Sequence, residues 1–255
     1  MKIIEVSSYD EMSKKAADLI VSQINENSDT VLGLATGGTV IGVYQKLVED
    51  HLVNRTSYRN VKTVNLDEYV GLDKYDPNSY RHYMMEKLFD HIDIPFKQTH
   101  LPNGTAKNLE EECLRYEDII SELDGIDLQL LGIGENGHIG FNEPGTSFPI
   151  KTHVVKLMDS TRQANARYFS SLDSVPTHAL TMGIDTIYRS KRILLLASGL
   201  KKARAIDQLL NGEISEELPA SVLKRHSDVV LVADKDALSL AKLKDQAFTL
   251  SELKM

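Results

Sequence analysis

This chain of 255 residues has little of what marks the more specialised classes of protein. It contains no tryptophan. Its single cysteine, Cys113, excludes an intramolecular disulfide. No apolar run approaches the roughly 18 residues that span a bilayer, and residues 1–6 lack the long apolar segment of a secretory signal. These absences predict a soluble, cytoplasmic protein with no membrane partner.

Positive charge is also scarce. The chain has 29 Lys and Arg against 37 Asp and Glu, a formal net charge of -8, which argues against broad binding to nucleic acid. A small anion stays compatible with this balance, because a few backbone N–H groups and one or two cations hold a phosphate. What is present is an ordinary globular composition, 42% hydrophobic and 26% charged, which predicts a sizeable core.

Short apolar runs alternate with amphipathic helical patterns along the chain. Runs such as 193–196 and 229–232 are continuously apolar, which is typical of strands covered on both faces in a parallel sheet. We therefore expect one domain, residues 1–255, with a three-layer α/β/α sandwich around a doubly wound, mostly parallel, Rossmann-like sheet. The expected strands are 2–6, 31–35, 61–65, 127–133, 153–158, 192–197 and 229–233. The expected helices are 9–25, 39–51, 79–91, 108–123, 160–171, 201–210 and 235–246.

Three polar loops directly follow expected strands, at residues 36–39, 66–69 and 134–143. In a doubly wound sheet, ligands bind outside the carboxyl ends of the strands, near the point where the winding reverses. We therefore expect these loops to open on the same edge of the sheet and to form one active site.

The first loop reads Thr36-Gly37-Gly38-Thr39 and stands between a strand and a helix. Its glycines allow a sharp turn, and its hydroxyls and free N–H groups at a helix start can hold a phosphate. A tight turn with a threonine N-cap is the structural alternative. A Walker loop is excluded, because no Gly-Lys-Ser/Thr follows.

The second loop contributes Asp67, and the third carries His138 and Glu143 five residues apart. Apolar neighbours predict partial burial of Asp67, which would tune its carboxylate as a base, although a cap or solvated charge is the alternative. A neutral imidazole held by a carboxylate can accept and return a proton near neutral pH. A histidine bonded within a structural loop is the rival interpretation, and a zinc site is weaker because no His-Glu-x-x-His is present.

Residues 132–137 also fit the Gly-x-Gly-x-x-Gly pattern of dinucleotide sites. That site requires a helix to begin inside the motif, and Gly140 and Pro144 disfavour one. We expect no nucleotide cofactor.

Two cations complete the candidate groups: Arg167, on an expected helix, and Lys202, at a strand–Gly–helix junction. Most such cations are solvated, but Lys202 is expected to face the same sheet edge as the loops.

Several segments, in order along essentially the whole chain, closely resemble the glucosamine-6-phosphate deaminases of the glucosamine/galactosamine-6-phosphate isomerase family. The most specific are Asp-Glu-Tyr-Val-Gly-Leu at 67–72 and Gly-His-Ile-Gly-Phe-Asn-Glu-Pro at 137–144. Further matches lie at 34–39, 79–80, 161–167, 179–183 and 219–221.

The resemblance implies an enzyme of amino sugar metabolism and N-acetylglucosamine catabolism. It would convert glucosamine 6-phosphate and water to fructose 6-phosphate and ammonium, without metal or cofactor. The resemblance assigns Asp67 as the base that moves a proton between carbons 2 and 1, and His138, oriented by Glu143, as the group that assists ring opening. The sugar phosphate would be held by the 36–39 turn with Arg167 and Lys202, and Gly137 is counted with the substrate-binding residues.

The chain departs from the family pattern at two places. Asn136 stands where better-known members have an aspartate, so the proton relay must rely on Glu143, and we place Asn136 in the site as a hydrogen-bonding residue. Residues 153–156 lack the Arg-x-Lys-Thr cluster with which larger relatives bind N-acetylglucosamine 6-phosphate, apart from a displaced Lys156. We therefore expect a non-allosteric enzyme.

Two alternatives remain. A 6-phosphogluconolactonase has a similar fold but needs no carbon-2 base, so Asp67 beside His138 and Glu143 favours the deaminase. A sugar-phosphate-sensing domain of a transcription regulator should carry a helix-turn-helix module, for which the chain has no spare residues. The sequence leaves open whether the protein is a monomer or a homo-oligomer.

Overall fold

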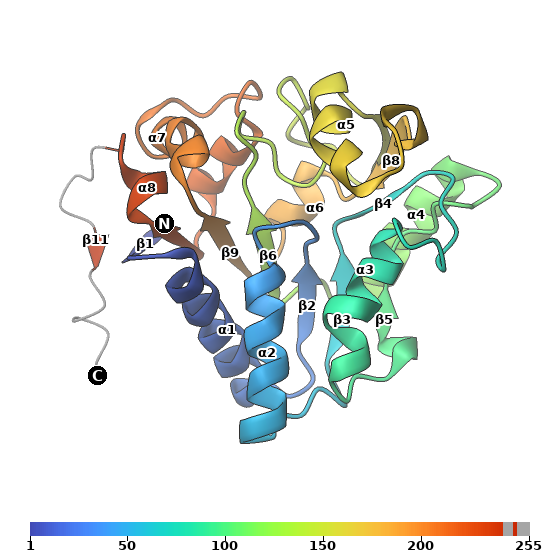
Figure 1. Ribbon diagram of the computed structural model, residues 1–255, viewed down its shortest axis with the longest axis horizontal. Coiled ribbons are helices and arrows are strands. Elements are labelled where there is room, and N and C mark those ends of the chain that lie inside the picture. The colour runs from blue at the N-terminus through green and yellow to red at the C-terminus, as the bar shows by residue number, and fades with distance from the viewer. Residues whose placement is uncertain (242–246, 249–255) are drawn as a thin grey trace.

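A parallel sheet of eight strands forms the centre of the protein (Figure 1). The computed structural model describes residues 1–241 and 247–248. All pairings within the sheet are parallel. In spatial order the strands are β11 (Ala247–Phe248), β1 (Lys2–Val6), β10 (Val229–Asp234), β9 (Arg192–Ala197), β6 (Leu128–Gly132), β2 (Val31–Leu34), β3 (Lys62–Asn65) and β5 (Thr99–His100).

Helices cover both faces of this sheet (Figure 1). In front lie α1 (Tyr9–Glu26), α2 (Ile41–Asn54) and α3 (Tyr80–Lys87), and behind it lie α4 (Leu109–Glu122) and α6 (Ile184–Tyr188). Two further helices, α7 (Ala203–Asn211) and α8 (Lys235–Leu238), follow β9 and β10. The expected doubly wound, mostly parallel sheet between helical layers is therefore confirmed. No helix in the described residues is both long and apolar enough to cross a membrane.

The direction of winding reverses between β2 and β6. From β2 the chain proceeds outward to β3 and β5, whereas from β6 it proceeds the other way to β9 and β10. β2 and β6 are nevertheless neighbours, with Leu32 opposite Leu128 and Gly33 opposite Gln129. The segments that leave their carboxyl ends must separate, and this separation opens a crevice above the two strands.

A second, antiparallel sheet lies above the first, near the carboxyl ends of its strands (Figure 1). It contains β4 (Asp67–Tyr69), β8 (His178–Thr181) and β7 (His153–Lys156). The strand expected at 153–158 is present as β7, but it pairs in this small sheet and not in the main one. Three of its residues are partly buried and Lys156 is exposed, as in an antiparallel sheet with one open face.

The other expected elements are confirmed, with shorter bounds at several ends. Helix 160–171 stops early: α5 (Asp159–Asn165) gives way to a 3₁₀ helix at Ala166–Tyr168. The helix expected at 235–246 is α8, which ends at Leu238, and residues 242–246 lie outside the described part of the chain. The sequence did not predict β4, β5, β8, β11 or α6, all of five residues or fewer.

Candidate active site

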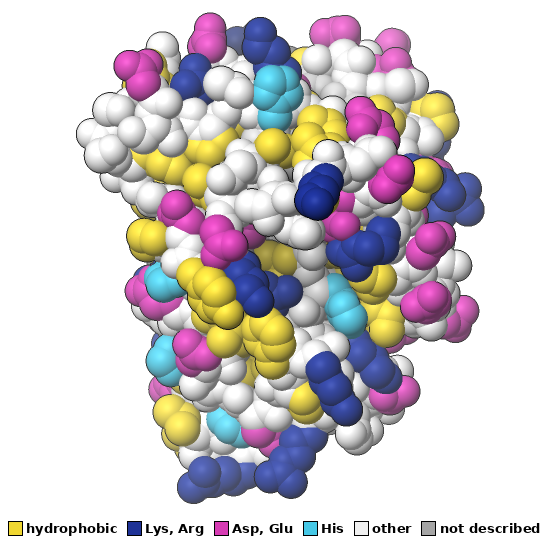
Figure 2. Space-filling model, turned by 90° about the vertical axis from the view of Figure 1, so that its right-hand side faces the viewer, with side chains coloured by type: hydrophobic (Ala, Val, Ile, Leu, Met, Phe, Trp, Pro, Cys, Tyr) yellow, Lys and Arg dark blue, Asp and Glu magenta, His cyan; other side chains and the backbone are white. Residues whose placement is uncertain are grey.

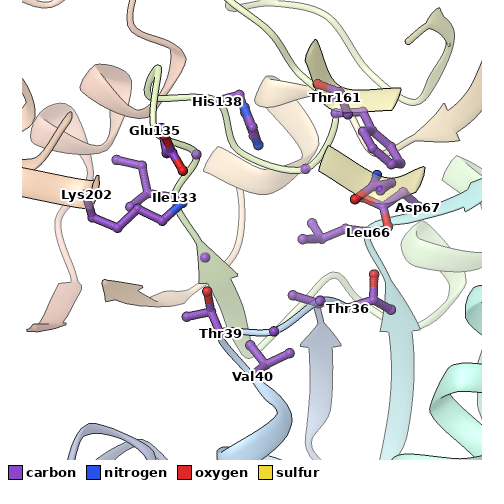
Figure 3. Close-up of a pocket in the computed structure, with 18 of the residues that line it drawn as sticks. Thr36, Thr39, Val40, Leu66, Asp67, Ile133, Glu135, His138, Thr161 and Lys202 are labelled. Carbon is purple, nitrogen blue, oxygen red and sulfur yellow. The ribbon is translucent and has the colours of Figure 1, made fainter. Parts of the chain in front are cut away.

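A cavity of about 700 Å³ opens at the carboxyl ends of β2 and β6. All three loops that follow expected strands contribute to its wall, so their predicted convergence is confirmed. In Figure 3, Asp67 and Lys202 lie on opposite sides of this cavity, with His138 above and the turn carrying Thr36 and Thr39 below.

The turn after β2 presents unpaired N–H groups. The hydroxyl of Tyr83 donates to the carbonyl of Gly37 and that of Tyr9 to the carbonyl of Gly38, each at 2.9 Å. The N–H groups of Gly37, Gly38 and Thr39 find no acceptor within residues 1–241 and 247–248. Gly37 has a φ of +102°, a conformation that glycine adopts without strain.

The start of α2 adds to this polarity. The expected helix start at Thr39 was two residues early, because α2 begins at Ile41 with Val40 as its N-cap. Val40 itself makes no side-chain capping bond, and in the first turn the N–H of Gly42 donates to the hydroxyl of Tyr9 at 2.9 Å. The threonine N-cap alternative therefore fails. The positive end of the α2 dipole lies next to the N–H groups of the turn, which have no acceptor in the described part of the chain, and this arrangement attracts an anion.

Asp67 and Glu68 are consecutive residues of β4 with different surroundings. The Glu68 carboxylate accepts three backbone hydrogen bonds of 2.9 Å, from Tyr69, Tyr80 and Arg81, and so caps the start of α3. Asp67 is 6% exposed, lines the cavity and accepts no hydrogen bond from the described residues. Sequence analysis placed Asp67 in a loop, but β4 fixes its backbone opposite Thr181 of β8.

Burial makes Asp67 unusually basic. Removal of its carboxylate from water, with the nearby charge of Glu68, raises the pKa of Asp67 to about 8. Burial also raises the pKa of Glu68 to about 7, although its three N–H bonds and Arg81 oppose this. Asp67 is therefore a carboxylate suited to taking a proton from a ligand in the cavity.

The loop after β6 contains no helix, as expected, which leaves the dinucleotide fingerprint without its structural context. The N–H of Gly134 donates to the carbonyl of His138 at 2.9 Å. The side chain of Asn142 donates to the carbonyls of Ile139 and Met182, which attaches the loop to the end of β8. His138 is thus held on a rigid turn at the edge of the cavity.

Asn136 lies between His138 and Glu143. Nδ1 of His138 is 2.7 Å from Oδ1 of Asn136, whose Nδ2 donates to Oε2 of Glu143 at 2.7 Å. Nδ1 is also 3.5 Å from that Glu143 oxygen. With its Nδ1 proton directed to Asn136, His138 presents Nε2 as a proton acceptor. The sequence analysis expected Glu143 to support the histidine, and the nearer partner is Asn136.

Glu143 stays ionised in this network. Burial acts to raise its pKa, but hydrogen bonding and attraction from His138, with hydrogen bonds from Thr161 and Asn136, lower the pKa to about 2. Glu143 is not part of the cavity wall. Its carboxylate lies behind the wall that His138 and Asn136 form, within 3.5 Å of Nδ1 of His138.

Two cations reach the cavity from other elements. Lys202 ends the 3₁₀ helix Leu200–Lys202 that precedes α7, and burial lowers its pKa. Arg167 lies on the 3₁₀ helix after α5, with its guanidinium 4.8 Å from the ring centre of Tyr168. Neither forms an ion pair with the described residues, so both charges are available to an anionic ligand.

Gly137, expected among the substrate-binding residues, lies outside the cavity wall. This residue is buried. Its N–H donates to the carbonyl of Gly134, its own carbonyl accepts from Ala220, and a side chain would collide with Leu218. Gly137 shapes the loop, and its φ of +85° is one that glycine favours.

Sequence reasoning assigned no role to several residues of the cavity wall. Tyr80, Thr161 and Asn165 are among them, together with Tyr9 and Ser198. The spacing of Thr161 and Asn165 is the one local signal, because residues four apart share a face of a helix. No group of three or more His, Cys, Asp or Glu in the described part of the chain is placed to hold a metal ion.

Comparison with known proteins identifies the family. The sequence profile of the glucosamine-6-phosphate isomerases/6-phosphogluconolactonase family matches residues 6–232. The chain belongs to this family. Glucosamine-6-phosphate deaminase of Geobacillus sp. (strain WCH70) is 61% identical over 240 residues, 94% of this chain and 96% of the relative. Glucosamine-6-phosphate deaminase 1 of Bacillus subtilis (strain 168) is 56% identical, with 94% and 99% covered.

Solved structures in the family show the same fold. A monomeric glucosamine-6-phosphate deaminase superposes with a TM-score of 0.92 at 56% identity, covering 94% of this chain and 100% of that one. The 6-phosphogluconolactonase of Trypanosoma cruzi superposes with a TM-score of 0.77 at 21% identity, covering 93% and 96%. The second likeness extends to the fold alone.

The raised pKa of Asp67 predicts an effect on stability. In the folded protein this pKa is about 8, against an ordinary value of 3.8, so ionisation of Asp67 opposes folding. At pH 7, Asp67→Asn should raise the free energy of unfolding by on the order of 1 kcal/mol or more, and with it the melting temperature. The gain should grow from pH 4 to pH 8 and disappear below 3.8, as measured by thermal unfolding.

Asp18→Asn is the matched control, because Asp18 is exposed on α1. It should leave the melting temperature unchanged across this range. A gain for Asp67→Asn that was the same at pH 4 and pH 7 would contradict a buried, basic carboxylate.

Proposed function

We propose that this protein converts glucosamine 6-phosphate and water into fructose 6-phosphate and ammonium. The observation that carries the proposal is the placement of Asp67 and of His138 on two walls of one cavity, with Asn136 and Glu143 bonded in series to His138. Below them lies a turn whose N–H groups have no acceptor among the described residues. The names of its relatives at 56–61% identity agree with this activity.

The substrate phosphate would bind at the turn 36–39 with Lys202 and Arg167. Backbone N–H groups and two cations that have no partner among residues 1–241 and 247–248 complement a dianion. This contact is remote from the reacting carbons and restrains an otherwise flexible open chain. It leaves carbons 1 and 2 beside Asp67, across the cavity from Lys202 (Figure 3).

Ring opening needs one proton removed from the anomeric hydroxyl and one delivered to the ring oxygen. Nε2 of His138 can do both in turn, because Nδ1 is committed to Asn136. Asn136 carries no charge, so the positive charge that His138 gains is offset by Glu143, whose Oε2 lies 3.5 Å from Nδ1. The relay thus opens the ring without a metal.

Isomerisation then follows on the open chain. Asp67 takes the proton from carbon 2, and the aldehyde oxygen takes the proton that the ammonium group loses, which gives an enolamine. Asp67 then returns its proton to carbon 1, which gives a protonated imine at carbon 2. Water adds to this imine and ammonia leaves, which yields the ketone of fructose 6-phosphate. The raised pKa of Asp67 favours this step, since abstraction of a proton from carbon requires a strong base. Hydrolysis of a lactone involves no such step.

Three narrower proposals concern nucleic acid as a partner, the location of the activity and its regulation. On the face at the β5 side of the sheet, Lys and Arg side chains are interspersed with Asp and Glu (Figure 2), which does not favour nucleic acid as a partner. We assign the activity to the cytoplasm, where phosphorylated sugars are made and used. The peptide at β7 reads His153-Val154-Val155-Lys156 and offers a single permanent cation, which supports a non-allosteric enzyme.

An ammonium assay with glucosamine 6-phosphate tests the function. The wild-type protein should release ammonium, and Asp67→Asn should lower kcat by about 100-fold or more while binding of substrate persists, because the change removes a base and no phosphate contact. Hydrolysis of 6-phosphogluconolactone without any ammonium release would refute the proposal.

Lys202→Ala should act on substrate binding. Loss of a charged hydrogen bond to phosphate should raise KM by about 10- to 100-fold, with a smaller effect on kcat. Lys201→Ala is the matched control, because Lys201 is exposed and lies 3.8 Å from Glu135. Equal changes in KM for the two variants would exclude Lys202 from the phosphate site.

N-acetylglucosamine 6-phosphate should leave the kinetics unchanged. The dependence of rate on glucosamine 6-phosphate should be hyperbolic with and without it, because β7 lacks the basic cluster that would bind an effector phosphate. A sigmoidal curve that the compound converted to a hyperbola would show an allosteric site.

A further inference from the structure

One helix, α5, makes a hydrogen bond to each half of the proposed chemistry. Thr161 Oγ1 donates to Glu143 Oε1 at 2.7 Å, on the ring-opening side. Asn165 Nδ2 donates at 2.9 Å to the hydroxyl of Tyr69, which follows Asp67 and Glu68 in β4. Both residues of α5 line the cavity. Figure 3 shows Thr161 above Asp67, on the same side of the site.

The two oxygens of Glu143 have different partners. Oε1 accepts from Thr161, while Oε2 accepts from Asn136 and lies 3.5 Å from Nδ1 of His138. A carboxylate bound through one oxygen only can turn about its side-chain bonds, whereas one bound through both is fixed. The Thr161 hydroxyl therefore determines where Oε2 lies, and through Asn136 where the imidazole points.

We propose that Thr161 is a positioning residue for the ring-opening relay, which it aligns by holding the carboxylate of Glu143. Thr161 acts through Glu143 and Asn136 and not on the reacting atoms. The proposal rests on the proposed function, since it assigns this hydroxyl a part in that same reaction.

The phosphate contact belongs to the same segment. α5 ends at Asn165 and continues without a break into the 3₁₀ helix that carries Arg167. Arg162 of α5 donates to the carbonyls of Leu172 and Val175, which attaches the helix to the segment that follows it. A dianion bound by Arg167 therefore stabilises the arrangement of α5 in which Thr161 reaches Glu143. Binding energy from the phosphate is thus used at the ring oxygen.

Thr161→Val and Thr161→Ser test the positioning role. The valine variant keeps the shape of the side chain and loses the donor, so kcat should fall by about 10- to 100-fold with KM changed by less than about 3-fold. The serine variant keeps the hydroxyl and should restore most of kcat. Unchanged kcat in the valine variant, or no recovery with serine, would overturn the proposal.

Thr146→Val is the matched control. The Thr146 hydroxyl also donates to Glu143, but to its backbone carbonyl, which accepts the Thr146 N–H as well and so keeps the turn. Its kcat should stay near that of the wild type. A loss as large as that of Thr161→Val would mean that any loosening of the loop lowers kcat, and this would overturn the positioning role of Thr161. Equal melting temperatures of the two valine variants would exclude misfolding as the cause.

The link to phosphate is tested with the substrate in two pieces. Inorganic phosphite should increase the release of ammonium from glucosamine, which has no phosphate of its own, and Thr161→Val should remove this increase. The same activation in both proteins would overturn the link between α5 and the relay. Failure of the wild type to release ammonium from glucosamine 6-phosphate would instead refute the proposed function.

Discussion

The parallel pairing of β2 with β6 is the constraint on which the rest of the site depends. Because the chain winds in opposite directions from these two neighbours, the segments after them cannot pack together, and a cavity forms between them. One side receives the turn 36–39 and the other the loop 134–143. The small antiparallel sheet then brings Asp67 to the open edge, so that the turn 36–39, Asp67 and His138 all line one cavity.

Burial of the Asp67 carboxylate raises its pKa and lowers the stability of the folded protein. Glu68 is satisfied by three N–H groups at the start of α3, whereas Asp67, its neighbour in β4, is left without a donor in the described part of the chain. That imbalance raises the pKa of Asp67 and makes it a stronger base. The relay is built differently, because its carboxylate is satisfied at both oxygens and stays ionised.

Much of this was predictable from local sequence. Continuous apolar runs indicated the central strands, and polar loops directly after them indicated where Asp67 and His138 would meet. The small sheet was not predictable in the same way, because β4 has three residues and is defined by pairing with β8, more than a hundred residues away. The place of Gly137 behind the cavity wall was not predictable, because it depends on the packing of Leu218, which is distant in sequence. The bond of Thr161 to Glu143 had no local signal beyond the spacing of Thr161 from Asn165, because the two partners are 18 residues apart in sequence.

The central claim is that Asp67 moves a proton between carbons 2 and 1, and hydrogen exchange measures that step directly. When fructose 6-phosphate is incubated with ammonium and the wild-type protein in D₂O, the sugar phosphate should gain one deuterium at carbon 1, which NMR detects. Asp67→Asn should bind the sugar phosphate and show no exchange. Exchange at the wild-type rate in the Asp67→Asn variant would contradict the account.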